Sequence, residues 1–233
     1  MKYLWHKNIP PIRLHFSFVL IFFVYALYIA ATSNLNIFLN TCILFAILFV
    51  SVLLHELGHS FKAFELGYET AHITLYPFGG VAAIGRSSST GMMMQDNPSH
   101  ELKIALAGPL TNLLICVLAS PLAYFFDVPL MFELMILNLA MGVFNLLPAF
   151  PMDGGRVLRA SISMRFNHNI ATKVSLATSL IASTLFVFVG FMYGLTMLAV
   201  VGIILLLTIR QEFARLSKGK PTARLPTKYF SFI

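Results

Sequence analysis

Six long apolar segments, separated by shorter polar stretches, dominate the pattern of this chain. They cover about residues 12–31, 36–54, 102–126, 130–150, 174–192 and 195–209. Each is close to the roughly 20 residues that a helix needs to cross the hydrocarbon core of a bilayer, the last segment being the shortest. A segment inside lipid has to satisfy its own backbone hydrogen bonds, which an open sheet cannot do. The pattern therefore predicts an all-α polytopic membrane fold with about six transmembrane helices.

The composition supports placement in the lipid bilayer. Hydrophobic residues make up 58% of the 233 positions and charged residues only 11%, whereas soluble domains carry about 25% charged residues. Such a chain cannot cover a water-exposed surface with polar side chains, so an integral membrane protein is expected. The first segment has a long apolar run and no good small-x-small cleavage site after it, which favours a retained anchor over a cleaved signal peptide.

The positive charges are confined to one side of the predicted helices. With six spans, all 16 Lys and Arg residues fall in segments that share one side, namely 1–13, 55–103, 151–173 and 210–233. The other side carries only the acids Asp127 and Glu133. The positive-inside rule therefore predicts that both termini and the segment after residue 54 face the cytosol, in a bacterial or archaeal cell membrane. Because topology explains the net charge of +7, no nucleic-acid partner is expected.

Residues 60–101 form the single long polar insert. Its first part continues the second helix to Gly67, which is suited to cap it. The following "HITLYPFGGVAAIG", residues 72–85, is rich in β-branched and aromatic residues and is interrupted by Pro77. Proline confines a strand to a sheet edge or a bulge, so we expect a small β-hairpin or edge strand on the cytosolic side. Further on, the run Met92–Met94 fits either a flexible gate that dips into the membrane interface or an ordinary loop.

A single transmembrane domain is expected over residues 1–213, followed by a short basic cytosolic tail over residues 214–233. The tail is too short to form a domain, and the chain shows no internal repeat. Cys42 and Cys116 both lie inside predicted spans, where free thiols pack as small hydrophobic side chains.

The stretch "SVLLHELGHSFKAFELG" places a polar motif at the end of the second apolar segment. On a helix, residues four apart share one face, so His55 and His59 can present two imidazoles to one metal ion. Glu56 lies beside them, where its carboxylate can reach a water bound to that metal. Zinc lowers the pKa of such a water toward about 7, and the carboxylate can take its proton. The alternative is a set of helix-end side chains at an interface with no metal.

A catalytic zinc needs a third protein ligand and an open fourth position. Asp153, in "NLLPAFPMDGGR", lies at the cytosolic end of the fourth predicted span, on the same side and at the same depth as His55. An acid beside prolines and glycines is also typical of a turn or a helix N-cap. Glu65 and Glu69 are the competing acids, but both follow His59 outside the bilayer. The matching depth favours Asp153.

Three motifs occur together in this chain: "HELGH" at 55–59, "AGPLTN" at 107–112 and "NLLPAFPMDGG" at 145–155. In this order they resemble the site-2 protease family of intramembrane zinc metalloproteases. The later family motif is Asn-x-x-Pro-x-x-Pro-x-Asp-Gly, and its fixed places are filled by Asn145, Pro148, Pro151, Asp153 and Gly154. The resemblance covers about residues 10–210. Some family members carry PDZ or CBS domains; we expect neither here, and the chain resembles the compact six-helix form.

The resemblance implies one catalytic Zn²⁺ held by His55, His59 and Asp153, with Glu56 as the catalytic base. It also implies an endopeptidase that cleaves membrane-anchored proteins in regulated intramembrane proteolysis. The alternative from another class is a non-catalytic zinc-binding membrane protein or a zinc transporter. A transporter needs polar residues throughout the depth of several spans, whereas the candidate ligands here lie at one depth. Serine and aspartyl intramembrane proteases are not supported, because the chain has neither Gly-x-Ser-Gly nor Gly-x-Gly-Asp.

The segment "YPFGGVAAI", residues 76–84, is the expected substrate platform. A substrate helix has to unwind before its peptide bond can reach the zinc, because its own hydrogen bonds shield the backbone. An edge strand at the membrane surface could catch the unwound segment by strand addition. Phe78, Gly79 and Gly80 are the candidate contacts, and the two glycines permit close backbone approach. An ordinary surface hairpin is the alternative.

Two asparagines are further candidates for substrate contact. Asn145 could hold substrate backbone or an oxyanion, or it could make an interhelical hydrogen bond. For Asn112, packing against the zinc helix is favoured, aided by the small Gly108, and contact with the active site is the alternative. Arg156 and Arg159 are interpreted as positive-inside anchors. The remaining histidines have no partner at ligand spacing and are interpreted as interfacial or structural: His6, His15, His72, His100 and His168.

Overall fold

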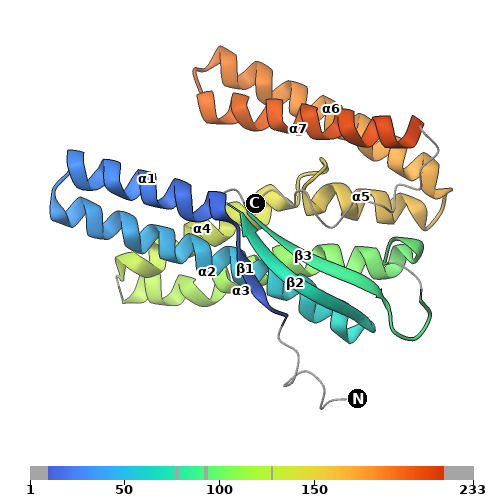
Figure 1. Ribbon diagram of the computed structural model, residues 1–233, viewed down its shortest axis with the longest axis horizontal. Coiled ribbons are helices and arrows are strands. Elements are labelled where there is room, and N and C mark those ends of the chain that lie inside the picture. The colour runs from blue at the N-terminus through green and yellow to red at the C-terminus, as the bar shows by residue number, and fades with distance from the viewer. Residues whose placement is uncertain (1–9, 77–78, 92–93, 127, 218–233) are drawn as a thin grey trace.

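The structure is a computed structural model, and it describes residues 10–76, 79–91, 94–126 and 128–217. Helices make up most of it, and a small three-stranded sheet lies beside them (Figure 1). Each of the six predicted apolar segments contains a helix. The prediction of a mainly helical fold with a small β-insert is therefore confirmed.

Several of the helices have the properties of membrane spans. Three are long and apolar enough to cross a membrane by length and composition: α2 (Leu35–Glu65), α3 (Pro98–Phe125) and α6 (His168–Met192). Shorter apolar helices are α1 (Phe16–Thr32), α4 (Pro129–Asn145) and the part Thr196–Arg210 of α7 (Thr196–Ser217). Large hydrophobic side chains are exposed along these helices, as expected of surfaces that face lipid. The chain is therefore a multi-pass membrane protein.

The helices α1 and α2 form a hairpin whose helix starts are capped by side chains. Nδ1 of His15 accepts a hydrogen bond from the Ser17 amide at the start of α1. Oδ1 of Asn34 accepts one from the Ile37 amide at the start of α2. The helix α2 ends where Gly67 adopts a φ of 86°, in the left-handed region that favours glycine. The prediction that the second helix continues to Gly67 is therefore confirmed.

The sheet combines the polar insert with the start of the chain. The strands β2 (Tyr68–Tyr76) and β3 (Gly79–Ser87) pair antiparallel, and β1 (Ile12–Leu14) pairs parallel with β2. The order is β1-β2-β3, so β3 is an edge strand and the predicted hairpin is confirmed. The first helix begins at Phe16, later than predicted, because the prolines before Ile12 favour extended backbone and Ile12 pairs with Ile73.

The helices α3 and α4 pack against α2 through small and polar side chains. Ser51, Asn112 and Asn138 are fully buried where the three helices meet, and they belong to one hydrogen-bonded chain. Gly142 on α4 lies against Leu113 on α3, which brings the two helices close together. Between membrane helices, close approach of small residues and interhelical hydrogen bonds replace the hydrophobic effect as the source of association. This packing sets the histidine-bearing part of α2 against α3.

A short helix that the sequence pattern did not predict, α5 (Asp153–Ser163), follows the loop after α4. One face of it is buried, including Gly155, Arg159 and Ala160. In Figure 1, α5 lies between α3 and a hairpin of α6 and α7. This hairpin also contacts the end of α4, where the rings of Phe144 and Phe186 stack with their centroids 6.1 Å apart. The helix α7 continues to Ser217, beyond the predicted end of the last apolar segment. Residues 218–233, most of the predicted tail, lie outside the described residues.

Candidate active site

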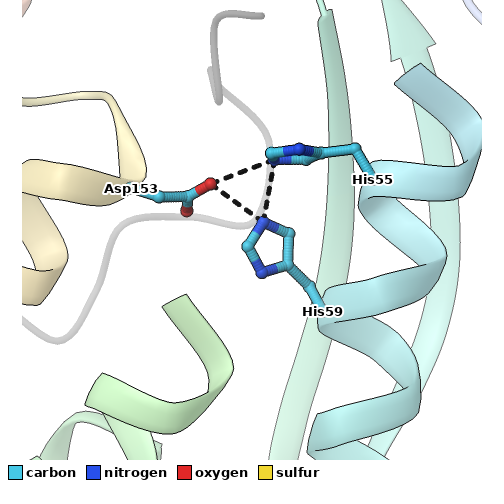
Figure 2. A group of neighbouring side chains, drawn as sticks. All are labelled: His55, His59 and Asp153. Carbon is cyan, nitrogen blue, oxygen red and sulfur yellow. Dashed lines mark hydrogen bonds and ion pairs between the residues drawn. The ribbon is translucent and has the colours of Figure 1, made fainter. Parts of the chain in front are cut away.

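The side chains of His55, His59 and Asp153 meet at one point between α2 and α5 (Figure 2). Oδ2 of Asp153 lies 3.0 Å from Nε2 of His55 and 2.9 Å from Nε2 of His59. The two Nε2 atoms are 3.1 Å apart, and all three side chains are buried. The four-residue spacing places both imidazoles on one face of α2, as the sequence predicts. No other group of three metal-binding side chains converges within the part of the chain that the structure describes.

Nδ1 of each imidazole points away from the meeting point and is hydrogen-bonded, and this bond determines whether Nε2 carries a proton or a lone pair. Nδ1 of His59 donates to the backbone carbonyl of Ile104 at 2.6 Å, and Nδ1 of His55 donates to Oδ1 of Asn112 at 2.8 Å. A neutral imidazole that donates from Nδ1 carries a lone pair on Nε2. Two lone pairs and a carboxylate oxygen therefore converge without a donor between them, and such a set needs a cation. Nitrogen and oxygen ligands held by outer hydrogen bonds fit a zinc ion with a fourth position left open.

Gly108 on α3 leaves the room that the imidazoles occupy. A Cβ atom at this position would lie 2.3 Å from Nε2 of His59 and 2.6 Å from Nε2 of His55. Gly58 on α2 leaves room for the backbone of α3, since a Cβ there would lie 2.9 Å from the carbonyl oxygen of Ala107. The backbone of α3 therefore forms one wall of the site, in direct contact with the histidine motif.

Asp153 is the first residue of α5, and the chain around it is held on both sides. The amide of Phe150 donates to Oγ of Ser179 on α6 at 2.7 Å. Nη1 of Arg156, one turn further along α5, donates to Oδ1 of Asp153 at 2.9 Å. Burial raises the pKa of the Asp153 carboxyl, and the charge of the adjacent Arg156 guanidinium lowers it. The arginine thus favours the ionised form of the carboxyl, which is the form that binds a metal.

Glu56 follows His55 in the chain and faces the sheet. Its Oε2 accepts a hydrogen bond from the Ala82 amide on β3 at 2.9 Å, and the residue is only 3% exposed. Gly80 passes so close that a Cβ there would lie 2.4 Å from Cγ of Glu56. A second buried carboxylate, not itself part of the ligand group, therefore stands next to the histidines, and the backbone of an edge strand holds it.

Four of the five predicted substrate contacts lie within the described residues. Asn145, the last residue of α4, is 1% exposed, and its Nδ2 has no hydrogen-bond partner within the described residues. Gly79 and Gly80 begin the edge strand β3, and Gly79 has a φ of 146°. Phe78 lies outside the described residues. An amide nitrogen that is buried without a partner is unusual and points to an oxygen atom that the described residues do not supply.

Asn112 lies behind His55, on the side of the imidazole away from Asp153. Its Oδ1 accepts from Nδ1 of His55, and its Nδ2 donates to Asn138. These contacts fit the favoured interpretation of Asn112 as a residue that packs against the zinc helix. Of the methionine run, Met94 is described and its sulfur accepts a hydrogen bond from Arg156 at 3.6 Å, whereas residues 92 and 93 lie outside the described residues.

The acids that compete with Asp153 have other partners. Glu65 forms an exposed ion pair with Lys62 at 2.8 Å. Glu69 accepts a hydrogen bond from Oγ of Ser88 at 3.2 Å, on the sheet. Neither carboxylate belongs to the converging group.

The interpretation of two arginines as membrane anchors needs correction. Arg156 binds Asp153, and the spacing of three residues on one helix face is a signal that could have shown it. Arg159 is 2% exposed and forms an ion pair with the fully buried Glu101 on α3. Its guanidinium also lies 5.2 Å from the centre of the Phe150 ring, in the loop that leads to Asp153. The ion pair therefore ties α5 to α3, and no local pattern links residues so far apart in the chain.

The apolar helices bring two histidines of one helix and an aspartate of another to one buried point. This arrangement defines a membrane-embedded metal-binding protein of the His-Glu-x-x-His type. The chain belongs to peptidase family M50, whose family model matches residues 43–131 and 127–189. These ranges contain the three motifs on which the resemblance to site-2 proteases rests, and that resemblance is confirmed.

Individual relatives agree with the family. The chain is 41% identical over 170 residues to a zinc metalloprotease of Methanocaldococcus jannaschii, in a match that covers 71% of this chain and 46% of the relative. It is 31% identical over 138 residues to stage IV sporulation protein FB of Bacillus subtilis, covering 57% of this chain and 45% of that protein. The chain thus spans about half the length of these curated relatives. Among solved structures it is similar to the site-2 protease from Methanocaldococcus jannaschii, with a TM-score of 0.63 and 34% identity, over 86% of this chain and 89% of that one.

Proposed function

We propose that this chain is a zinc metalloendopeptidase that hydrolyses peptide bonds in or near the transmembrane segments of membrane-anchored proteins. The observation that carries the proposal is the convergence of His55, His59 and Asp153, with the carboxylate of Glu56 beside them. Two imidazole lone pairs, a ligand carboxylate and a separate carboxylate are the groups that zinc-dependent hydrolysis uses. The names of the relatives, zinc metalloprotease and site-2 protease, support the same reaction.

The residues of the site have distinct roles in this reaction. His55, His59 and Asp153 would hold the zinc, which would supply a water of lowered pKa and polarise the peptide carbonyl. Glu56 takes the proton of the attacking water and later passes it to the leaving amine. The hydrogen bond from the Ala82 amide keeps the Glu56 carboxylate next to the ligands without tying it to the metal. Nδ1 of each histidine stays hydrogen-bonded throughout, which keeps the ligands in place.

We propose the edge strand β3 as the substrate platform. Its outer edge lies beside Glu56, so a substrate segment that has unwound could pair with it and bring a peptide bond to the ligands. Gly79 and Gly80, with the adjoining Phe78, are the contacts assigned to this platform. Asn145 is assigned to the substrate carbonyl or its oxyanion, because a buried amide nitrogen without a partner costs about 1–3 kcal/mol. A substrate oxygen would remove that cost.

We also propose that six helices cross the bilayer and that both termini and the ligands lie toward the cytosol. The distribution of all 16 Lys and Arg residues supports this orientation. Alkaline phosphatase, which is active only outside the cytosol, tests it when fused after residues 33, 127 or 194. These fusions should be active and fusions after residues 70, 165 or 215 inactive; the reverse pattern would contradict the orientation.

The test of the activity compares wild-type protein with Glu56→Gln. In cells, the wild type should release cytosolic parts of membrane-anchored proteins that Glu56→Gln leaves attached. The purified Glu56→Gln protein should keep its fold and its zinc, because the Glu56 carboxylate accepts from the Ala82 amide and does not belong to the converging ligand group. Cleavage by the purified variant would contradict the role of Glu56. Zinc flux into liposomes that is unchanged in Glu56→Gln, with no cleavage by either protein, would favour a transporter instead.

A further inference from the structure

A buried chain of hydrogen bonds between amide side chains lies behind His55. Nδ2 of Asn138 on α4 donates to Oγ of Ser51 and to the carbonyl of Leu134, each at 2.9 Å. Nδ2 of Asn112 on α3 donates to Oδ1 of Asn138 at 3.1 Å, and Oδ1 of Asn112 accepts from Nδ1 of His55 at 2.8 Å. Ser51, Asn112 and Asn138 are all 0% exposed, so these bonds are shielded from bulk solvent.

One backbone carbonyl determines the direction of every bond in this chain. The oxygen of Leu134 can only accept, so the nitrogen of the Asn138 amide faces it and the oxygen faces Asn112. The nitrogen of Asn112 then faces Asn138, and its oxygen faces His55. Nδ1 of His55 has to donate to that oxygen, which leaves the lone pair on Nε2, the atom that lies 3.0 Å from Asp153.

The two imidazoles of the site are therefore held in different ways. His59 donates to the backbone carbonyl of Ile104, whose oxygen cannot exchange places with a nitrogen. His55 donates to a side-chain amide, which can turn over. A turned Asn112 would present its NH₂ group to Nδ1, so Nδ1 would have to accept. Nε2 would then carry the proton and could not bind a metal.

We infer that Asn138 is a positioning residue for the metal site. Its described hydrogen bonds go to Ser51, Leu134 and Asn112 rather than to a ligand, and it holds the Asn112 amide in the one orientation that keeps the lone pair of His55 directed at the metal. The inference rests on the proposed zinc site and adds a residue, two hydrogen bonds away from His55, on which that site depends.

The test measures the zinc affinity of the full chain in detergent, by competition with a chromophoric chelator. Asn138→Leu has a similar volume and frees the Asn112 amide, so zinc affinity should fall about tenfold, as on loss of other outer groups of metal sites. Ser183→Ala is the matched control. Ser183 is also 0% exposed and donates to a carbonyl within α6, outside the amide chain, and its loss should leave zinc affinity unchanged.

A double variant separates orientation from packing. In Asn138→Leu/Asn112→Asp, both terminal atoms of residue 112 are oxygens, so His55 meets an acceptor whichever way the side chain turns. Zinc affinity should return close to that of the wild type, although the packing at residue 138 stays altered. Failure of the double variant to recover affinity would overturn the inference, and so would full affinity in a folded Asn138→Leu protein.

Asn138→Ala keeps the inference testable if Asn138→Leu does not fold. This smaller residue also frees the Asn112 amide, so zinc affinity should fall about tenfold. Full zinc affinity in the folded Asn138→Ala protein would overturn the inference. Absence of zinc from the wild type would overturn the zinc site together with the inference, whereas the variant outcomes overturn the inference alone.

Discussion

Gly80 on β3 and Glu56 on α2 are in direct contact: a Cβ atom on Gly80 would lie 2.4 Å from Cγ and 2.9 Å from Cδ of the glutamate. The edge strand can approach this closely only because residue 80 has no side chain. Two residues further along the strand, the Ala82 amide donates to the same carboxylate. Gly80 therefore sets the distance between β3 and Glu56, and the Ala82 amide sets the orientation of the Glu56 carboxylate.

Gly80→Ala is expected to lower proteolytic activity about 100-fold, because the added methyl group has to displace β3 or Glu56 by about 1 Å. Zinc content should stay that of the wild type, since none of the three atoms nearest to a Cβ at residue 80 belongs to a ligand. Cleavage of a membrane-anchored reporter and zinc content are measured on the same preparation. Gly85→Ala on the same strand is the control, because a Cβ there would lie 3.4 Å from the Glu69 carbonyl, an ordinary contact. Full activity of Gly80→Ala would refute the role given to the contact.

Unlike Gly80→Ala, which should retain zinc, Gly108→Ala should lose it. A Cβ atom 2.3 Å from Nε2 of His59 and 2.6 Å from Nε2 of His55 occupies the space from which both ligands bind. The helix itself should persist, since alanine is a better helix former than glycine by about 1 kcal/mol. Zinc per protein, measured by atomic absorption after dialysis, should fall well below one. A variant that retains stoichiometric zinc would show that α3 lies further from the ligands than described.

Removal of zinc should lower the Tm of the wild-type protein. An ion that binds only the folded state stabilises it by mass action, by about 2.7 kcal/mol when its free concentration is 100 times its Kd. Asp153→Ala lacks one ligand, so it should hold less zinc, and a chelator should lower its Tm less than that of the wild type. If Asp153→Ala retains full zinc, the third ligand lies elsewhere in the chain.

The buried ion pair between Glu101 and Arg159 gives a prediction about stability. Either Glu101→Gln or Arg159→Met alone leaves a buried charge without its partner, which costs about 3–5 kcal/mol. The double variant removes both charges and should recover much of that loss in thermal unfolding. Glu65→Gln, which breaks the exposed pair with Lys62, is the control and should change stability by less than about 1 kcal/mol. Additive losses in the double variant would mean that the two residues do not act as a pair.

The parts of the site that the sequence could predict are those that depend on local geometry or on the membrane. Four-residue spacing on a helix is enough to place His55 and His59 together. Asp153 is separated from His59 by 94 positions, and its prediction needed the positive-inside rule, which places both residues at one face of the bilayer. Without a membrane to define a common depth, that acid would have been one candidate among several.

The parts that could not be predicted depend on which helices become neighbours. The Ile104 carbonyl holds His59, but a backbone oxygen carries no signal in the sequence. Asn138 stands out as a polar residue in an apolar helix, which indicates a polar contact but not its partner. The helix α5 is short and amphipathic, and the apolar segments on either side of it obscure its pattern. Its pairing with α3 through Arg159 is a tertiary contact that no local rule predicts.

The parallel pairing of β1 with β2 has a consequence for how the chain is made. Ile12 precedes α1 and Ile73 follows α2, yet they are neighbours in one sheet. The two strands can meet only if the intervening chain returns to the face of the bilayer from which it set out. If only one of these two helices were inserted, β1 and β2 would lie on opposite faces of the bilayer and could not pair. With both helices inserted as proposed, the sheet, and with it the strand beside Glu56, is completed only after α1 and α2 have both crossed the bilayer.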